Sequence, residues 1–303
     1  MDKKSVLQVA LGHVMWGILP LYWAMLAHMD PMFNLACRIC WAVAVTVGVL
    51  AATKKLPPYK AVFVDKQKMK YLIPAAVFLL LDWGVFIYAV QSGHVLDTSL
   101  GYYMGPFVVF AIDMLVFKEK HGKHTLIAML LVLIGVAFFV VYNVIQYGRF
   151  PMLSILLSCL FAIYAMLKKF AQVDSVVGIA AETTMMLPLA LVFLIVFRGA
   201  DVAALTFGDH LLLIGAGVVT AVPMMLYSVG VIRLPFAMLG FMQYISPTLS
   251  LLCGLLLGET VTPDKLVALL FIWAGIGLYM YAAIKEENRA GGGGRIRNNS
   301  EQA

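Results

Sequence analysis

The chain has 303 residues, of which 62% are hydrophobic and only 13% are charged, and its mean hydropathy is +0.92. Soluble domains carry roughly 25% charged residues, so this composition excludes a soluble domain and predicts an all-α integral membrane protein in a lipid bilayer. The net charge of +6 is explained below by membrane topology, and we expect no nucleic-acid partner.

Ten apolar stretches are long enough to cross a bilayer at about 1.5 Å per residue. They cover residues 5–27, 32–52, 71–91, 99–117, 124–145, 151–170, 176–197, 211–231, 236–258 and 264–284. The connections are short, except for the lysine-rich loop 53–70. The first stretch is too long for a typical signal peptide and lacks a convincing cleavage site, so we interpret it as a retained span.

The basic residues predict the orientation of the spans, because cytoplasmic loops carry an excess of Lys and Arg. With the N-terminus inside, 18 Lys and Arg residues lie in cytoplasmic segments, including Lys168 and Lys169, and three lie outside. The three outside residues are Arg149, Arg198 and Lys265. Both termini are therefore predicted to be cytoplasmic.

The two halves of the chain resemble each other. Tyr103-x-x-Pro106 matches Tyr244-x-x-Pro247. Glu119, Ala128 and Gly135 precede Glu259, Ala268 and Gly275 by 140 residues, and Asp30 precedes Asp174 by 144. Five spans per copy is an odd number, so the copies enter the membrane in opposite directions, an architecture common in secondary transporters. We predict inverted five-helix repeats over 1–145 and 150–285, followed by a disordered tail over 286–303.

Ionisable side chains within spans are expensive and indicate function. They are His13, Arg38, Asp82, Asp113 and Glu182. Arg38 and Glu182 occupy equivalent positions in the two repeats, and two hypotheses stay open: they pair with each other as a structural strut, or they contact the substrate. Asp82 precedes Trp83, and a carboxylate beside aromatic rings suits a cation or a hydrogen-bonding ligand.

A second signal is polar or small faces on apolar helices. Gly240, Gln243, Tyr244 and Pro247 recur at helical spacing, and such a face favours a helix neighbour or a watery cavity over lipid. The expected cavity and substrate-binding residues are Trp16, Arg38, Asp82, Trp83, Tyr103, Glu182, Gln243 and Tyr244. Proton coupling, if present, would use Asp82, Glu182, Asp113 or His13, and the expected hinges are Pro20, Pro106, Pro223 and Pro247.

Signals for other chemistry are weak. Cys37 and Cys40 form a C-x-x-C in apolar surroundings, which favours packing over redox or metal chemistry. His121 and His124 lack a third ligand, so we interpret their segment as a lysine-bearing solvated turn. Nucleotide-binding, serine-hydrolase and metalloprotease motifs do not occur. We expect no cofactor, no metal and no enzymatic activity.

Several motifs together resemble one known family. They are Trp16-Gly17-x-x-Pro20, Arg38-x-x-Trp41, Trp83 with Phe86-Ile87-x-Ala89, Ser99-Leu100-Gly101-Tyr102-x-x-x-Pro106, Glu182-Thr183 with Leu187-Pro188, Val219-Thr220-x-x-Pro223 and Leu239-Gly240-Phe241-x-Gln243-Tyr244-Ile245-x-Pro247-Thr248. In order and over all ten spans, they resemble the RarD group of the EamA branch of the drug/metabolite transporter (DMT) superfamily. The resemblance implies two inverted five-helix repeats around a central cavity in the bacterial inner membrane, and export of drugs or metabolites. Asp82, where the group commonly has Asn, and Lys120, where it has Arg, depart from the pattern.

The leading prediction is a secondary active transporter that exports a small organic solute by alternating access, as a monomer or homodimer. Proton coupling is part of this hypothesis. An importer or facilitator of the same fold is the first alternative. More remote alternatives are an intramembrane enzyme similar to an aspartyl protease, using Asp82 and Asp113, and a non-transporting sensor or scaffold.

Overall fold

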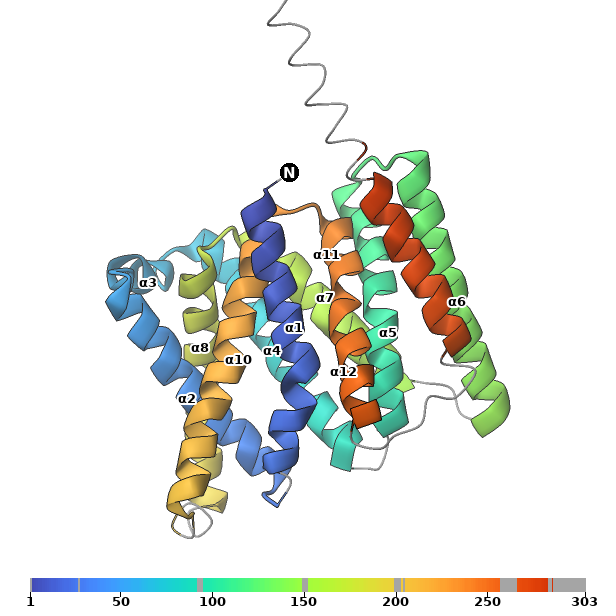
Figure 1. Ribbon diagram of the computed structural model, residues 1–303. Helices are drawn as coiled ribbons and strands as arrows, with labels where there is room; N and C mark the ends of the chain where they lie inside the picture. The colour runs from blue at the N-terminus through green and yellow to red at the C-terminus, as the bar shows by residue number, and fades with distance from the viewer. Residues whose placement is uncertain are drawn as a thin grey trace, which may run out of the picture. The chain divides into compact units, whose positions relative to one another are not determined.

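The structure of the protein, a computed structural model, describes residues 2–26, 28–91, 95–148, 152–198, 203, 205–256, 266–282 and 285. Within them the secondary structure is helical (Figure 1). The helices are α1 (Lys3–Met25), α2 (Pro31–Ala52), α3 (Leu56–Val62), α4 (Lys66–Gln91), α5 (Val95–Ile112), the π-helix η1 (Asp113–Phe117), α6 (Lys123–Tyr147), α7 (Met152–Ala171), α8 (Ser175–Phe197), α10 (Phe207–Arg233), α11 (Phe236–Gln243), α12 (Ile245–Leu256) and a further helix, Leu266–Ala282. The predicted tail lies outside the described residues.

The helices confirm a multi-pass membrane protein. Among the described residues, six helices are long and apolar enough to cross a membrane, and two shorter apolar helices cover Met104–Phe117 and Leu266–Ala282. Large apolar side chains stay exposed on these helices, for example Ile145 at 76% and Ile195 at 74%. Lipid is the solvent such surfaces require. The count of ten spans and the cytoplasmic termini remain predictions.

The chain forms two compact units, and each draws on both halves of the sequence. The larger unit contains residues 2–112 and 151–259, and the smaller unit contains 113–150 and 260–303. The predicted repeats divide the chain differently, at about residue 145, because a repeat is defined by sequence similarity and a compact unit by packing.

In the larger unit, helices of one half pack mainly on helices of the other half (Figure 1). Helix α1 packs on α10 and α12, α2 on α8 and α10, α4 on α7 and α8, and α5 on α7 and α11. The repeat pairs α1 with α7, α2 with α8, and α4 with α10. When each helix is replaced by its counterpart, the contact of α1 with α10 becomes that of α7 with α4. The packing is therefore symmetric under this pairing of helices, and the inverted repeats themselves remain a prediction.

Helices α2 and α8 lie antiparallel and are tied together at both ends. Asp30 and Asp174, which the repeat aligns, accept backbone N–H bonds at the start of α2 and α8 respectively. Asp30 also pairs with Arg198 just after α8, at 2.8 Å, and Asp174 pairs with Lys55 just after α2, at 2.7 Å. Each helix start thus meets the other helix end, which is the relationship that an inverted repeat predicts.

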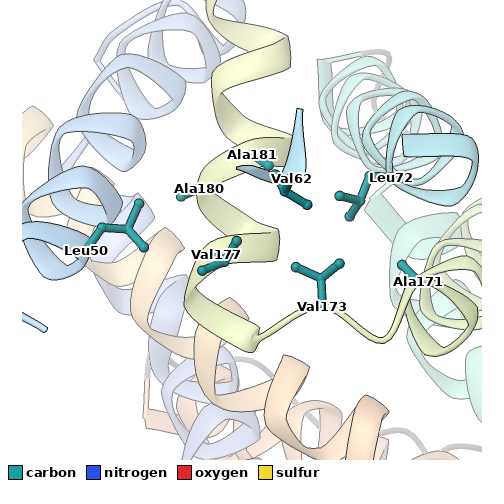
Figure 2. Close-up of a cluster of buried hydrophobic side chains, with 8 residues drawn as sticks. All are labelled: Leu50, Val62, Leu72, Ala171, Val173, Val177, Ala180 and Ala181. Atoms are coloured by element: carbon teal, nitrogen blue, oxygen red, sulfur yellow. The ribbon is translucent and has the colours of Figure 1, made fainter. Parts of the chain in front are cut away.

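The loop predicted over 53–70 contains a short helix, α3, with prolines in its first turn, where a missing N–H costs nothing. Val62 at its end is buried in an apolar cluster (Figure 2). The cluster consists of Leu50, Val62, Leu72, Ala171, Val173, Val177, Ala180 and Ala181. Leu56 and Tyr59 of α3 also pack against this cluster, so burial of apolar side chains favours a helix in part of a lysine-rich segment that was expected to be a loop.

In the smaller unit, α6 and the helix Leu266–Ala282 approach closely at two glycines. A Cβ atom placed on Gly135 would lie 2.8 Å from the carbonyl oxygen of Ala268, and one on Gly275 would lie 2.8 Å from that of Ala128. The sequence repeat aligns Gly135 with Gly275 and Ala128 with Ala268. The two contacts therefore involve equivalent residues of the two helices. Small residues at these positions permit the close approach.

The ninth predicted span is divided into α11 and α12 at Tyr244. Pro247 has no N–H, so it cannot donate to the carbonyl group of Gln243 four residues earlier, and the helical ladder is interrupted there. The division lies next to Gln243, a residue predicted to line the cavity. A broken helix of this kind is tolerated in a membrane protein where protein or a polar site surrounds it.

Candidate functional site

Four rings from three helices of the larger unit meet in one group. The His13 and Trp16 ring centroids on α1 are 5.1 Å apart, and both lie within 5.6 Å of the Tyr227 ring on α10. Phe161 on α7 is 5.4 Å from Tyr227 and 6.0 Å from Trp16. Gln243, at the end of α11, lies near the Tyr227 hydroxyl and interacts with it. The arrangement of the two groups does not meet the geometry of a direct hydrogen bond. We call these five residues the aromatic cluster.

Small residues hold α1 in place beside this cluster. A Cβ atom on Gly12 would lie 3.1 Å from the carbonyl oxygen of Pro223 on α10, and one on Gly17 would lie 2.6 Å from the side chain of Leu249 on α12. Ser250 donates a hydrogen bond of 3.1 Å to the carbonyl oxygen of Gly17. Helix α1 is therefore wedged between α10 and α12, which sets the position of His13 and Trp16.

Several polar atoms of this region are buried without a hydrogen-bond partner among the described residues. They are His13 Nε2, Tyr227 Oη and Gln243 Nε2. Their residues are between 0% and 8% exposed. Buried polar groups are almost always hydrogen-bonded, and each exception calls for an explanation. Atoms of this kind on α1, α10 and α11, beside three aromatic rings, mark the aromatic cluster as the candidate site.

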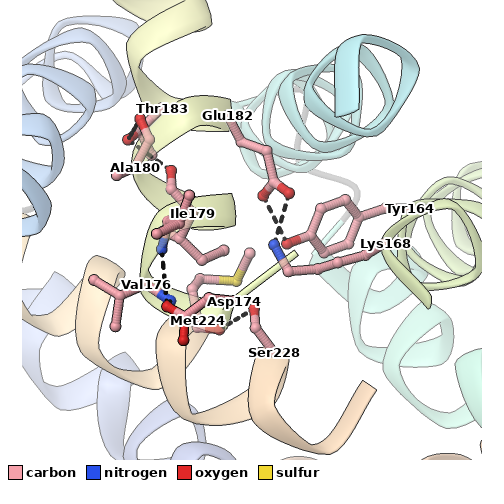
Figure 3. Close-up of polar contacts among 11 residues, drawn as sticks. Tyr164, Lys168, Asp174, Val176, Ile179, Ala180, Glu182, Thr183, Met224 and Ser228 are labelled. Carbon is pink, nitrogen blue, oxygen red and sulfur yellow. Dashed lines mark hydrogen bonds and ion pairs between the residues drawn. The ribbon is translucent and has the colours of Figure 1, made fainter. Parts of the chain in front are cut away.

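Next to the aromatic cluster, Glu182 on α8 is held by two partners from α7 (Figure 3). Lys168 Nζ lies 2.6 Å from Glu182 Oε1, and the Tyr164 hydroxyl donates to Oε2 at 3.0 Å. All three side chains are at most 2% exposed. We call Lys168 and Glu182 the buried ion pair. The Tyr164 ring is 5.8 Å from that of Phe161, which connects the pair to the aromatic cluster.

The buried ion pair corrects one expectation. Lys168, one of the basic residues predicted to lie on the cytoplasmic side, is 2% exposed and binds a carboxylate, and its side of the membrane remains a prediction. The strut hypothesis named Arg38 as the partner of Glu182, whereas the ion-pair partner in the structure is Lys168. Phe161, Tyr164 and Lys168 are three and four residues apart in the sequence. This spacing indicates that their side chains share one face of α7.

Arg38 lies between two tryptophans instead. Its guanidinium carbon is 4.5 Å from the centre of the Trp83 ring on α4 and 5.4 Å from that of Trp23 on α1. Both distances are typical of cation–π contacts. Asp82 lies within electrostatic range of Arg38. Asp82 and Trp83 were predicted to suit a bound cation. In the structure, the cation beside them is the side chain of Arg38.

In the smaller unit, Asp113 is fully buried at the start of η1 and hydrogen-bonded to His121. The side chain of His121 is only 10% exposed, so the expectation of a solvated turn is wrong at this residue. Glu119 also interacts with Asp113. The described residues contain no group of three or more His, Cys, Asp or Glu side chains arranged to hold a metal ion.

Comparison with known proteins identifies the family. The EamA-like transporter family matches residues 3–141. The uncharacterized transporter YojE of Bacillus subtilis is 34% identical over 93% of this chain and 95% of its own length. The chain belongs to the EamA-like transporter family. The protein RarD of Escherichia coli is 30% identical over 95% of this chain and 97% of its own, which confirms the resemblance to the RarD group.

A solved crystal structure shares the fold of this EamA-like transporter. It aligns with a TM-score of 0.68 over 92% of this chain and 97% of its own, at 16% sequence identity. The likeness supports the arrangement of helices and says nothing of the substrate. The family match and the transporter names of the relatives establish a membrane transporter of the DMT type.

The remaining predicted site residues of this EamA-like transporter have varied surroundings. Tyr244 is 1% exposed where α11 ends, next to Gln243. Pro106, Pro223 and Pro247 are buried within α5, α10 and α12, and their role as hinges stays a prediction. Tyr103 and Pro20 belong to α5 and α1, but their side chains lie outside the described part of the chain.

Proposed function

We propose that this transporter is a secondary active exporter of a small organic solute in the bacterial inner membrane, working by alternating access. One observation carries the proposal: α1, α10 and α11 each contribute a buried polar atom that has no hydrogen-bond partner among the described residues, on side chains that belong to the aromatic cluster. A substrate site between the two halves of the chain is what an inverted-repeat transporter needs, because tilting one half against the other opens it to either side in turn.

Three further features support this reading. The ends of α2 and α8 are cross-linked by ion pairs in an antiparallel arrangement, as inverted repeats require. The buried ion pair places a carboxylate of α8 one residue, Tyr164, away from the aromatic cluster. A proton taken up by Glu182 would release Lys168, so this carboxylate is the group we propose for proton coupling. The transporter names of the relatives favour transport over an intramembrane enzyme.

Solute flux without ATP tests the proposal. Liposomes with the purified full chain would be loaded with a mixture of small organic solutes, and the loss of each solute would be followed by mass spectrometry under an imposed pH gradient. We expect some solutes to leave faster than from protein-free liposomes, and this flux to fall in Gln243→Leu. Asn143→Leu in the smaller unit is the matched control, since Asn143 only donates to the carbonyl oxygen of Phe139 in its own helix.

The alternatives give different results in the same assay. A facilitator would equilibrate solutes without responding to the pH gradient, and an importer would move them inward when the gradient is reversed. No protein-dependent flux of any solute would contradict the proposal as a whole.

A further inference from the structure

The hydrogen bonds around His13 determine which of its nitrogens carries the proton. The Ser246 hydroxyl donates to the backbone carbonyl oxygen of His13 at 2.9 Å, and His13 Nδ1 lies 3.0 Å from the same hydroxyl oxygen. A serine hydroxyl has one hydrogen, so both contacts form together only when that hydrogen goes to the carbonyl oxygen, which can only accept. The contact with Nδ1 is therefore satisfied when Nδ1–H donates to Ser246. A neutral imidazole then has a bare lone pair on Nε2.

Nε2 of His13 is consequently a buried acceptor that needs a donor. It has no hydrogen-bond partner among the described residues, and His13 is 2% exposed. A doubly protonated ring would instead bury a charge with its second N–H unmatched, at a much greater desolvation cost. A ligand bound at the aromatic cluster would therefore need a hydrogen-bond donor facing His13 Nε2.

Gln243 supplies the complementary group. Its Oε1 faces Gly105 on α5, where an added Cβ atom would lie 3.3 Å away, and its Nε2 is the amide atom without a partner among the described residues. An amide NH₂ group donates only. The aromatic cluster therefore presents one acceptor from α1 and one donor from α11, with the Tyr227 ring beside His13 and its hydroxyl, which can donate or accept, near Gln243.

Resting on the proposed function, we propose that the aromatic cluster selects an uncharged, planar solute with an amide-type pair of groups, one N–H donor and one C=O acceptor. The N–H donates to His13 Nε2, the C=O accepts from Gln243 Nε2, and the flat body lies against Trp16, Phe161 and Tyr227. A carboxylate has no donor for His13, and an ammonium ion has no acceptor for Gln243. The cluster rejects both because each leaves a buried polar group unmatched.

Four small probes of similar shape separate these requirements. They are benzamide, N,N-dimethylbenzamide (which lacks the donor), benzoate and benzylammonium. Binding to the purified full chain in detergent would be measured by thermal stabilisation and by saturation-transfer NMR. We expect benzamide to bind about tenfold more tightly than each of the other three, since one unmatched buried group costs roughly a factor of ten or more. Equal binding of all four, or tighter binding of a charged probe, overturns the proposal.

Two variants assign the selectivity to the two side chains. His13→Asn keeps a donor for Ser246 but removes the Nε2 acceptor, so benzamide should lose its advantage over N,N-dimethylbenzamide. Gln243→Met removes the donor, so both probes should weaken together while their ratio stays near tenfold. Unchanged selectivity in His13→Asn overturns the proposal. If that variant does not fold, Gln243→Met still decides, because unweakened binding there also overturns it. Asn143→Leu is the matched control for loss of a buried polar side chain.

Binding and flux distinguish the two levels of proposal. Selective, His13-dependent binding of benzamide without transport of any solute would leave this inference standing and contradict the proposed function. Flux of other solutes, together with equal binding of the four probes, would support the proposed function and contradict this inference.

Discussion

Lys168 and Glu182 form an ion pair 2.6 Å long in which both side chains are at most 2% exposed. The second carboxylate oxygen accepts from Tyr164. Removing one partner of such a pair leaves an uncompensated buried charge, whereas replacing both by apolar groups of similar size is often neutral or stabilising. Single and double substitutions of Lys168 and Glu182 can therefore distinguish a structural role of the ion pair from a role in transport.

We expect Lys168→Met and Glu182→Leu each to lower the stability of the folded protein by ~3–5 kcal/mol, and the double variant to recover most of the loss. Thermal unfolding in detergent and the monodisperse yield would measure this. Arg38→Met should not rescue Glu182→Leu, because Arg38 lies over Trp83 and Trp23. Rescue by Arg38→Met, and not by Lys168→Met, would contradict the assignment. A stable double variant that has lost the response of flux to a pH gradient would support proton coupling through Glu182.

Gly135 and Gly275 should be equally intolerant of a side chain, because each faces a carbonyl oxygen of the opposite helix. We expect Gly135→Ala and Gly275→Ala each to cost about 1–3 kcal/mol, since the helices must separate to admit the methyl group. Gly277→Ala is the matched control in the same helix, because an added Cβ meets nothing within 4 Å there. Thermal unfolding would measure all three variants, and an effect of Gly277→Ala as large as the others would contradict the packing argument.

The pairing of Asp174 with Lys55 predicts a pH dependence. Partial burial acts to raise the pKa of Asp174, but the hydrogen bond from Lys55 and the Val177 and Val176 amides outweigh it, so the pKa is lowered in the folded protein. The stabilisation is therefore present above the unfolded pKa of ~3.9 and is lost as pH falls through the folded pKa.

Asp174→Asn should remove this contribution, which is ~1 kcal/mol or less because both side chains are over a third exposed and screened by solvent. Unfolding at pH 7 should distinguish the variant from the parent, and the difference should shrink at acidic pH. A difference that grows towards acidic pH would mean that the sign of the pKa shift is wrong.

The ion pairs join segments that the positive-inside count assigns to one side of the membrane. Lys55 and Asp174 belong to predicted cytoplasmic segments, and Asp30 and Arg198 to predicted outside segments. Single cysteines at 30 and 198 should react with an impermeant thiol reagent in intact cells, and those at 55 and 174 only after permeabilisation. The parent chain is the control, since its four cysteines are buried or half-buried. The reverse pattern would overturn the orientation while leaving the pairing intact.

The sequence by itself determined the class, the family and much of the architecture. Hydrophobic stretches of membrane-spanning length have few alternatives to helices, because lipid cannot hydrogen-bond a backbone. The aligned positions Asp30 and Asp174, and Gly135 and Gly275, proved to make equivalent contacts, because a cap and a close helix crossing each demand one kind of residue at one place. Trp16, His13 and Gln243 were found as candidates for the same reason: polar side chains at the middle of a span need a polar neighbour.

Only the tertiary structure decided which of those side chains meet. Glu182 and Arg38 are equivalent in sequence, yet Glu182 binds Lys168 and Arg38 lies on Trp83. Charge type cannot choose between two possible cations, because the choice depends on which side chain reaches the carboxylate of Glu182 in the folded protein. Likewise, the proton on His13 is assigned by Ser246, which lies 233 residues away along the chain. Contacts between helices distant in sequence are set by packing, and packing is what a single sequence read along its length leaves open.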